Sequence, residues 1–443
     1  MIKRSTLSVP QMVALAVPTL VFAGYDLARR NYLAVYLTDD LKLSVDAVGW
    51  LILIVNLASI PAELLAGAFG DHGMQAFGRR RQWMVLGTLL VAAGVMALEA
   101  RGSAWPGLVT GGALVALVVG WALSNVTHGA WALEATGDAV QRARVFGWRS
   151  VVGIAGSIGF SALAAAPLGL ARSPFLAILL PVAIGACVTH ALLIAIVDDR
   201  RPVAGGWSAG LLAQPLRLLI ADAPNRRLAA LFALNGAHTA LTATCYQYVV
   251  RHGLGLPGWG PTGLLVQSVC AAIGMLLVVR LGGRLSAAGL LRFVLWTNLV
   301  LGLALLAVPV RDPAALLVWS GLSGLFSMAD FMALRLLLGE RIDARARAGT
   351  DSLAAAHYAG FHLPFNLCAA LAAGALFLGF WLFGFDPNAA PAPARAFAPV
   401  MLVPSLAGAV LMLLSLRIVD RVAAGSALAL PPADGNDAAP AKS

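Results

Sequence analysis

The sequence predicts an all-α integral membrane protein with twelve transmembrane helices in two related six-helix halves. Of its 443 residues, 60% are hydrophobic and 12% are charged, and the mean hydropathy is +0.83. A soluble globular domain contains about 25% charged residues. Apolar windows long enough to cross a bilayer, about 20 residues each, recur along the whole chain. A motif repeated after the fourth and tenth windows indicates the two halves.

The expected spans of the first half are residues 10–37, 44–69, 83–101, 106–134, 147–171 and 174–196. Those of the second half are 226–250, 260–281, 289–310, 314–339, 351–383 and 397–418. The longest polar connection separates the two sets. We therefore predict an N-terminal bundle over 1–196, a cytoplasmic linker over 197–225 and a C-terminal bundle over 226–418. The segment 419–443 is rich in Ala, Pro and Asp, a composition typical of a disordered cytoplasmic tail.

The formal net charge of +10 comes from short arginine clusters between apolar windows, such as Arg79–Arg81. Arginines gather in the even-numbered loops, whereas odd-numbered loops hold mostly single charges. Because cytoplasmic loops carry the excess of basic residues, both termini are expected in the cytoplasm, with the chain in a plasma (inner) membrane. No basic helix or aromatic-interleaved patch supports binding to nucleic acid.

Motifs that carry enzyme chemistry are missing from the sequence. It contains no Walker motif, HExxH pair or nucleophile elbow, so neither an ATP-driven pump nor a membrane hydrolase has support. The four cysteines are isolated and have neither metal-ligand spacing nor the pairing of a disulfide framework. We expect no enzymatic activity, no cofactor and no metal.

Three charges lie within five residues of the first apolar window: Asp26, Arg29 and Arg30. At helical spacing, Asp26 meets the two arginines at i+3 and i+4. A charged side chain at the centre of a membrane costs at least ~2.5–3.5 kcal/mol and persists where it faces a protein interior or a wet cavity. The cluster predicts a pathway for a polar, negatively charged solute. A buried structural ion pair is the alternative for Asp26 with Arg30, and for Asp330 with Arg335.

Polar stripes on three further windows point to the same pathway. The fourth window carries a polar face at i, i+4 and i+7, and the seventh and tenth carry similar faces. The fifth window adds Arg149. Packing of small hydroxyl side chains between helices is the alternative for the serines and threonines. The candidate binding residues on these stripes are Ser124, His128, Trp131, Arg149, Asn235, His238, Thr242, Tyr246, Ser327 and Asp330.

One further acid, Glu63, follows Pro61 in the second window. A proline kinks a membrane helix and frees backbone carbonyls, so polar chemistry gathers around it. Glu63 could carry a coupling proton, or it could bind Arg29 or Arg30 structurally. Asp26 and Asp330 are the other candidate coupling acids.

The two loops that suggest an internal repeat run from Glu134 to Gly147 and from Glu340 to Gly349. Each reads as an acid, an Asp-Ala pair, an Arg-x-Arg pair and a glycine, six windows apart. Parallel six-helix repeats are typical of major facilitator transporters. Chance similarity between loops rich in alanine and arginine is the alternative. The paired positions include Arg142 and Arg345.

The stretch Tyr36-Leu-Thr-Asp39, then Leu43 to Gly49 and Gly78-Arg-Arg-Arg-Gln-Trp83, resembles the glycoside–pentoside–hexuronide:cation symporter (melibiose permease-like) family. The segments Ala132-Leu-Glu134 and Gln141-Arg-Ala-Arg144 resemble its signature after helix 4. The resemblance implies a major facilitator fold, in which helices 1, 4, 7 and 10 line a central cavity. It also implies gating roles for loop residues: Asp71, Arg79, Arg80, Glu134, Arg142, Glu340 and Arg345.

The family's binding residues carry over only in part. Its helix-1 sugar aspartate corresponds to Asp26 and its helix-5 arginine to Arg149. Its two sodium-binding acids fall on Ser59 and Glu63, so one acid is missing. Its helix-4 acid falls on Ser124, its sugar-stacking tryptophan on His128, and its helix-11 lysine near Pro364. These departures weaken the expectation of a sodium–sugar symporter, and Arg29 and Arg30 favour an anion.

We therefore expect a monomeric secondary transporter that moves a small polar solute by alternating access. The solute is expected to be anionic or zwitterionic and, by resemblance, a sugar or sugar derivative. Coupling to protons is expected over coupling to sodium. A non-transporting membrane scaffold on the same fold, and a transporter of lipids or amphiphiles, are the alternatives.

Overall fold

The computed structural model describes residues 7–70, 80–100, 106–136, 139–166, 173–199, 216–282, 284–347, 354–388 and 398–427. The described residues form helices and no strand. Twelve helical segments among them are long and apolar enough to cross a membrane. The chain is therefore a multi-pass membrane protein, as its composition predicts.

The first half contains six spans. The first consists of α1 (Val9–Ala16), α2 (Pro18–Leu27), η1 (Ala28–Tyr32), α3 (Leu33–Val35) and η2 (Tyr36–Asp40). The others are α4 (Val45–Gly70), α5 (Arg81–Glu99), α6 (Pro106–Ala135), α7 (Ala139–Ala165) and α8 (Pro174–Ile196). The fifth span thus begins earlier and ends earlier than the predicted range 147–171. The sixth matches its predicted bounds.

The second half repeats this arrangement. Its spans are α10 (Ala223–Tyr248) continued by η3 (Val249–Gly253), α11 (Gly260–Gly282), α12 (Ala287–Ala304) continued by η4 (Leu305–Ala307), α13 (Pro313–Phe326) with α14 (Ala329–Arg347), α15 (Ala354–Leu382) and α16 (Pro399–Ala427). The last helix runs past the predicted boundary at 418. Arg292 on α12 forms an ion pair with Asp420 at 2.7 Å, which holds this extension against the bundle.

Helix starts follow capping chemistry that can be read in the sequence. Ser173 and Asp222 precede a proline-containing first turn, and their side-chain oxygens accept hydrogen bonds from the backbone of Leu176 and Asn225. Asp312 does the same for two amides of α13. Each cap satisfies donors that the first helical turn leaves open, and proline lacks the amide that would otherwise need a partner.

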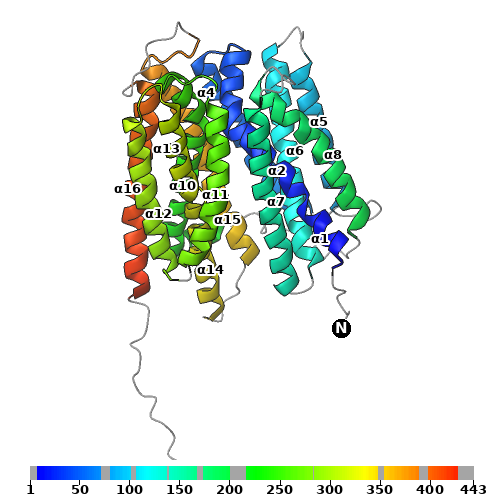
Figure 1. The fold of residues 1–443 in the computed structure, drawn as a ribbon. Helices are drawn as coiled ribbons and strands as arrows, with labels where there is room; N and C mark the ends of the chain where they lie inside the picture. The colour runs from blue at the N-terminus through cyan, green and yellow to red at the C-terminus, as the bar shows by residue number, and fades with distance from the viewer. Residues whose placement is uncertain are drawn as a thin grey trace, which may run out of the picture.

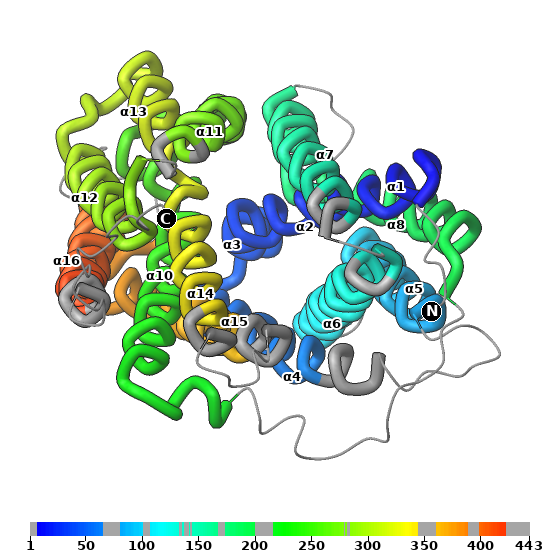
Figure 2. Tube along the Cα trace, turned by 90° about the horizontal axis from the view of Figure 1, so that it is seen from below, coloured from blue at the N-terminus to red at the C-terminus, as the bar shows by residue number. Residues whose placement is uncertain are grey.

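The two halves lie side by side, and the start of the first span and the end of the last span lie at the same face of the molecule (Figure 1). Seen from that face, α4 lies beside α15 and α7 beside α11, with the first span between them (Figure 2). Gly49 permits the first contact, because an added Cβ would lie 2.8 Å from Cβ of Phe377. The first span therefore lies at the centre, where a solute pathway of this fold would run, and α10 contacts it at η1.

Candidate solute-binding site

The first span departs from α-helical geometry where its charges lie. At η1 the backbone makes a π turn, in which the amide of Leu33 bonds to the carbonyl of Ala28. Arg29 and Arg30 belong to this turn, and Asp26 lies just before it. Single π turns inside α-helices occur frequently at functional sites because they shift side chains out of the regular stripe. The sequence predicts that these charges lie within the first span, but it predicts a regular α-helix there and not a π turn.

The predicted ion pairs are present. Asp26 Oδ1 lies 3.6 Å from Arg29 Nη2 and 3.8 Å from Arg30 Nε. These side chains are not sealed: Asp26 is 35% exposed, Arg30 is 29% exposed and Arg29 is 19% exposed. Two bases face one acid among these three side chains. A closed structural pair would be sealed and would not leave this exposure.

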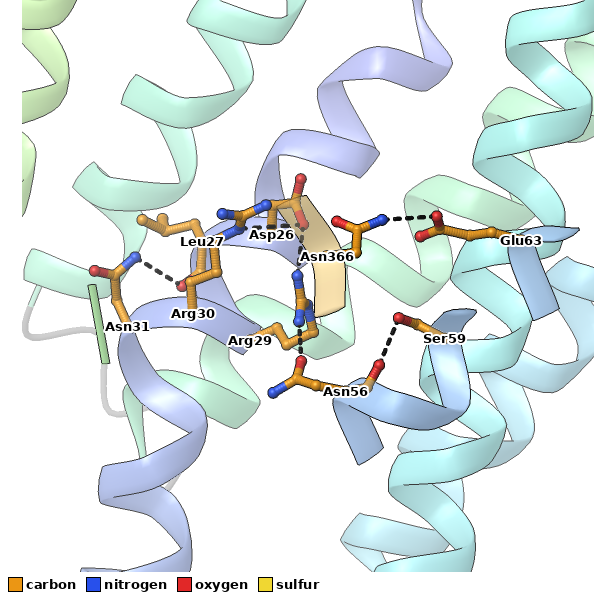
Figure 3. A network of polar contacts seen from close by, with 9 residues as sticks. All are labelled: Asp26, Leu27, Arg29, Arg30, Asn31, Asn56, Ser59, Glu63 and Asn366. Atoms are coloured by element: carbon orange, nitrogen blue, oxygen red, sulfur yellow. Dashed lines mark hydrogen bonds and ion pairs between the residues drawn. The ribbon is translucent and has the colours of Figure 1, made fainter. Parts of the chain in front are cut away.

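Neighbouring helices orient the arginines (Figure 3). Arg29 donates a hydrogen bond to the Asn56 side chain of α4. Its guanidinium also lies 5.9 Å from the centroid of Trp121 on α6, and that ring stacks on Tyr25 at 5.4 Å. A cation over an aromatic face is stabilised by the ring quadrupole. Arg29 is therefore held in place, while Arg30 contacts Asp26 and keeps more of its surface open.

Glu63 lies in the same region and links the two halves. Its Oε2 accepts a hydrogen bond of 2.8 Å from Asn366 Nδ2 on α15 (Figure 3). Each residue comes two positions after a proline, Pro61 in α4 and Pro364 in α15. Among the described residues, Glu63 forms no ion pair with Arg29 or Arg30. The hydrogen bond to Asn366 thus replaces the structural pairing considered from the sequence.

The polar face predicted on the fourth span lies inside the first bundle, away from the charged cluster. His128 is fully buried: its Nε2 donates to the carbonyl of Leu15 at 2.8 Å, and its Nδ1 accepts from Arg149 at 3.2 Å. Trp131 packs in the apolar cluster that contains Leu15 and Met84. Ser124 faces Gly87 of α5. A helix in such a bundle can carry polar side chains on the face toward its own bundle and on the face toward the pathway. The spacing of the residues alone does not tell these two faces apart.

The second-half residues also form contacts within their own bundle. Asn235 Nδ2 donates to Asp330 Oδ2 at 2.7 Å, and both side chains are buried. Asp330 lies in the first turn of α14, directly after the break that divides the predicted tenth span, and its Oδ1 accepts from the amide of Phe331. Arg335 stacks over the Phe331 ring at 4.3 Å.

The remaining predicted residues of the second half have mixed surroundings. The Tyr246 hydroxyl shares a hydrogen bond of 3.2 Å with Ser320. His238 faces Gly408 on α16. Thr242 and Ser327 are exposed and bond to carbonyls of their own helices. None of these side chains joins the charged cluster through a contact between described residues.

Of the predicted gating residues, Asp71 and Arg79 lie outside the described residues, as do the side chains of Glu134, Arg142 and Arg345. Arg80 is buried, and its backbone amide donates to Asp199. Glu340 is exposed. In the second half, Asp222 forms an ion pair with Arg341. Asp199 and Asp222 therefore hold helix ends within each half, a role that the loop motifs did not reveal.

Several contacts between the halves escaped sequence reasoning. The Thr38 hydroxyl shares a hydrogen bond of 2.9 Å with Tyr248, and Asp39 forms an ion pair with Arg251. Ser161 and Ser268 share a hydrogen bond of 3.0 Å. A signal existed for Asn56 and Asn366, since a lone amide inside an apolar window needs a partner. Pairing between distant spans has no such signal in one sequence.

Comparisons with known proteins agree with this architecture. The crystal structure of nucleoside transporter NupG matches with a TM-score of 0.65 and 10% identity, over 94% of this chain and 98% of that chain. That of a POT family transporter in complex with 5-aminolevulinic acid gives 0.65 and 12% identity over 93% and 96%. A bacterial homologue of iron transporter ferroportin in outward-facing state gives 0.60 and 14% over 94% and 99%. These likenesses show the fold.

No curated protein sequence matches the chain. A profile of one family, described as MFS/sugar transport protein, matches residues 14–422 and thus includes nearly all the spans. That family consists of transporters and not enzymes. With its twelve candidate spans and its facilitator architecture, the chain belongs to the MFS/sugar transport protein family.

Proposed function

We propose that the protein is a secondary transporter that moves a small anionic or zwitterionic solute of the sugar or sugar-derivative class by alternating access. The charged cluster on η1 is the observation that carries this proposal. Asp26, Arg29 and Arg30 are partly exposed in the middle of the first span, which lies at the centre between the halves. A charged side chain at that depth in a membrane costs free energy unless it faces a protein interior or a polar pathway.

Charge and geometry support an anionic group on the solute. The cluster has one acid and two bases, and Arg29 is already engaged by Asn56 and Trp121. Arg30 is therefore the base that would meet a carboxylate or phosphate, for which a planar guanidinium fork suits bidentate binding. Trp121, beneath Arg29 and stacked on the buried Tyr25, is the aromatic side chain beside this cluster. Membership of the MFS/sugar transport protein family and the structural similarity to the nucleoside transporter NupG support a hydroxylated solute.

Proton coupling rests on Glu63. It is an acid within a span, it lies beside the cluster, and its hydrogen bond to Asn366 crosses between the halves. A change in its protonation would therefore act on a contact that rocking must break. Asp26 and Asp330 are the other candidate acids. Sodium is disfavoured because Ser59 stands where relatives have a second acid, and its hydroxyl donates to the Asn56 carbonyl.

Inter-half contacts suggest which end of the pathway is closed. The pairs Thr38–Tyr248 and Asp39–Arg251 lie at the C-terminal ends of the first and seventh spans. At the opposite face, Asp222–Arg341 and Asp199–Arg80 join residues within a half. With both termini in the cytoplasm of an inner-membrane protein, this arrangement corresponds to an inward-accessible state. The bundles 1–196 and 226–418 would then rock about the centre.

The test is uptake into proteoliposomes by the purified protein. A panel of sugars, sugar acids, phosphates and amphiphiles is first screened for stabilisation against heat. Positive solutes are then offered with an imposed pH or sodium gradient. We expect a sugar acid to be taken up with the pH gradient, and Arg30→Gln to reduce its affinity by about tenfold or more, since a charge-assisted hydrogen bond contributes about 1.5–3 kcal/mol.

Arg292→Gln is the matched control, because it removes an arginine that pairs with Asp420 away from the centre. It should leave uptake unchanged. Strict dependence on sodium would contradict proton coupling. Anion affinity that survives Arg30→Gln would contradict the anion-binding role of the cluster. Uptake of amphiphiles alone would contradict the proposed sugar-derivative solute and favour an amphiphile transporter.

A further inference from the structure

Five arginines lie where α10 begins and α16 ends, at the face of the molecule where the last span ends (Figure 1). We call them the basic surface: Arg217, Arg226, Arg227, Arg417 and Arg421. Backbone contacts tie these segments together. Arg227 Nη1 donates to the carbonyl of Arg421 at 3.1 Å, and Arg226 Nη1 donates to that of Ile220, one turn after Arg217, at 3.1 Å. The five residues therefore share one end of the second bundle.

Acids do not compensate the charge of the basic surface. The described residues of α16, and of the chain from 216 to the end of α10, include two acids, and each has its own partner. Asp420 forms an ion pair with Arg292 at 2.7 Å, and Asp222 forms one with Arg341. Within the part of the chain that the structure describes, no arginine of the basic surface forms an ion pair. Uncompensated positive charge on one face attracts an anionic partner.

The arginines at the end of α16 continue a stripe that faces lipid. Leu406, Val410 and Leu413 are exposed at i, i+4 and i+7, and the exposed Arg417 and Arg421 follow on the same face at i+11 and i+15. α16 lies at the outer edge of the second half, on the side away from the first half (Figure 2). Its membrane-spanning window ends at Arg421. The apolar part of the stripe therefore meets acyl chains, and its two arginines lie at the depth of the headgroups.

A short helical segment before α10, residues 216–220, places apolar side chains beside the basic surface. Leu218 is buried against the bundle, and Asn225 Nδ2 donates to its carbonyl at 2.7 Å, so the segment is held in place. Leu216 and Ile220 are four residues apart on the opposite side and are 49% and 68% exposed. Exposed apolar side chains flanked by arginines are typical of a segment that lies between headgroups and acyl chains.

We propose that the basic surface binds the headgroup of an anionic phospholipid, in the leaflet on the side where α16 ends. Clusters of about four to eight basic residues beside a membrane span favour anionic headgroups. Arg417 and Arg421 lie about 6 Å apart along the helix axis, a spacing at which both guanidinium groups can donate to one phosphate.

A lipid is favoured over a free phosphate because its acyl chains can lie along the apolar stripe of α16 and against Leu216 and Ile220. The basic surface lies at the outer edge of the second half and not in the central pathway. The inference therefore goes beyond the proposed transport function and does not depend on the identity of the solute.

The test is native mass spectrometry of the purified full-length protein with added phosphatidylglycerol or phosphatidylcholine of matched acyl chains. We expect the wild-type protein to bind phosphatidylglycerol more tightly. Arg417→Gln combined with Arg421→Gln should weaken that binding by about tenfold or more, because each basic residue near an anionic lipid surface contributes about fivefold. Binding of phosphatidylcholine should not change. Neither side chain has a hydrogen bond or ion pair within the described residues, so the bundle should still fold.

Arg280→Gln combined with Arg284→Gln is the matched control. These exposed arginines have the same spacing of four residues, but they lie at and just after the end of α11. The control should leave the affinity for phosphatidylglycerol unchanged. An equal loss in this control, or equal binding of the two lipids by the wild-type protein, would overturn the proposal.

Two further outcomes would show that another group occupies the basic surface. Complete displacement of phosphatidylglycerol by inorganic phosphate would assign the surface to a free anion. The chain after α16 contains Asp434 and Asp437. If a preference for phosphatidylglycerol appears only when both are replaced by asparagine, the end of the chain covers the surface and the proposal fails.

Discussion

At the residue scale, charged and polar side chains within the spans differ in what surrounds them. His128 is fully buried and has a partner on each ring nitrogen, Leu15 and Arg149. Its hydrogen bonds are satisfied within one bundle, which is the behaviour of a structural residue. Asp26, Arg29 and Arg30 remain partly exposed, and among them two bases face one acid. Both places hold polar or charged side chains within a span, and only their burial and their partners distinguish a structural role from a functional one.

Glu63→Gln tests the coupling role at this scale. Glutamine keeps an oxygen that can accept from Asn366, so the inter-half hydrogen bond of 2.8 Å can persist while titration is lost. We expect solute exchange between equal concentrations to continue. Accumulation driven by a pH gradient of one unit, worth up to about tenfold for one proton, should disappear. Asn366→Leu is the companion variant: it breaks the hydrogen bond and retains the acid. Full gradient-driven accumulation by Glu63→Gln would place the coupling acid elsewhere.

At the element scale, several spans depart from regular α-helical geometry at points that their sequences do not predict. The first and seventh spans end in π turns, η2 and η3, and the tenth divides after Phe326. No proline lies at these points. Hydropathy predicts that a segment crosses the membrane, but a π turn changes the register of side chains without changing composition. Residues predicted on one stripe, such as Ser327 and Asp330, can therefore end on different sides of a break.

The break in the tenth span leaves a carboxylate at the start of α14. Asp330 lies in its first turn, where an acid is favourable for the helix dipole, and it is paired with Asn235. A double-mutant cycle of Asn235→Leu and Asp330→Leu tests whether this pair is a structural unit. Each single variant strands a buried group at a cost of about 1–3 kcal/mol, and the double variant should cost less than their sum. Thermal unfolding measures this. Additive losses would show that Asp330 acts with another partner.

At the scale of the whole molecule, the fold was more predictable than the site. Spans follow from composition, because backbone groups in lipid must be satisfied within the helix. The sixth span, 174–196, matches its predicted bounds. The site depends on which helix faces meet: Asn56 of α4 and Trp121 of α6 contact Arg29, and Asn366 of α15 contacts Glu63 beside the cluster. Such contacts arise from tertiary packing, which one sequence without pairwise information does not encode in any local pattern.

The contact that closes the end opposite the termini gives the last prediction. Asp39 on η2 and Arg251 on η3 form an ion pair between halves, beside the Thr38–Tyr248 hydrogen bond. Rocking to the other state must break both. Reversing one charge, as in Asp39→Arg, places two bases together and should shift the conformational equilibrium about fivefold, the equivalent of ~1 kcal/mol for a partly exposed pair. Adding Arg251→Asp should restore the original balance.

Spin labels at Asp46→Cys and Ala314→Cys, in the chain with its four native cysteines replaced, report this shift, because both positions are exposed and start helices α4 and α13 in opposite halves. The single reversal should increase the population with longer label distances, and the double reversal should return it. The pair Arg292–Asp420 lies within one half, so reversing it should not change the distances. If Asp39→Arg leaves the distribution as in the wild type, the ion pair does not hold this end closed. The closure must then depend on the Thr38–Tyr248 hydrogen bond of 2.9 Å, which also joins the two halves at this end.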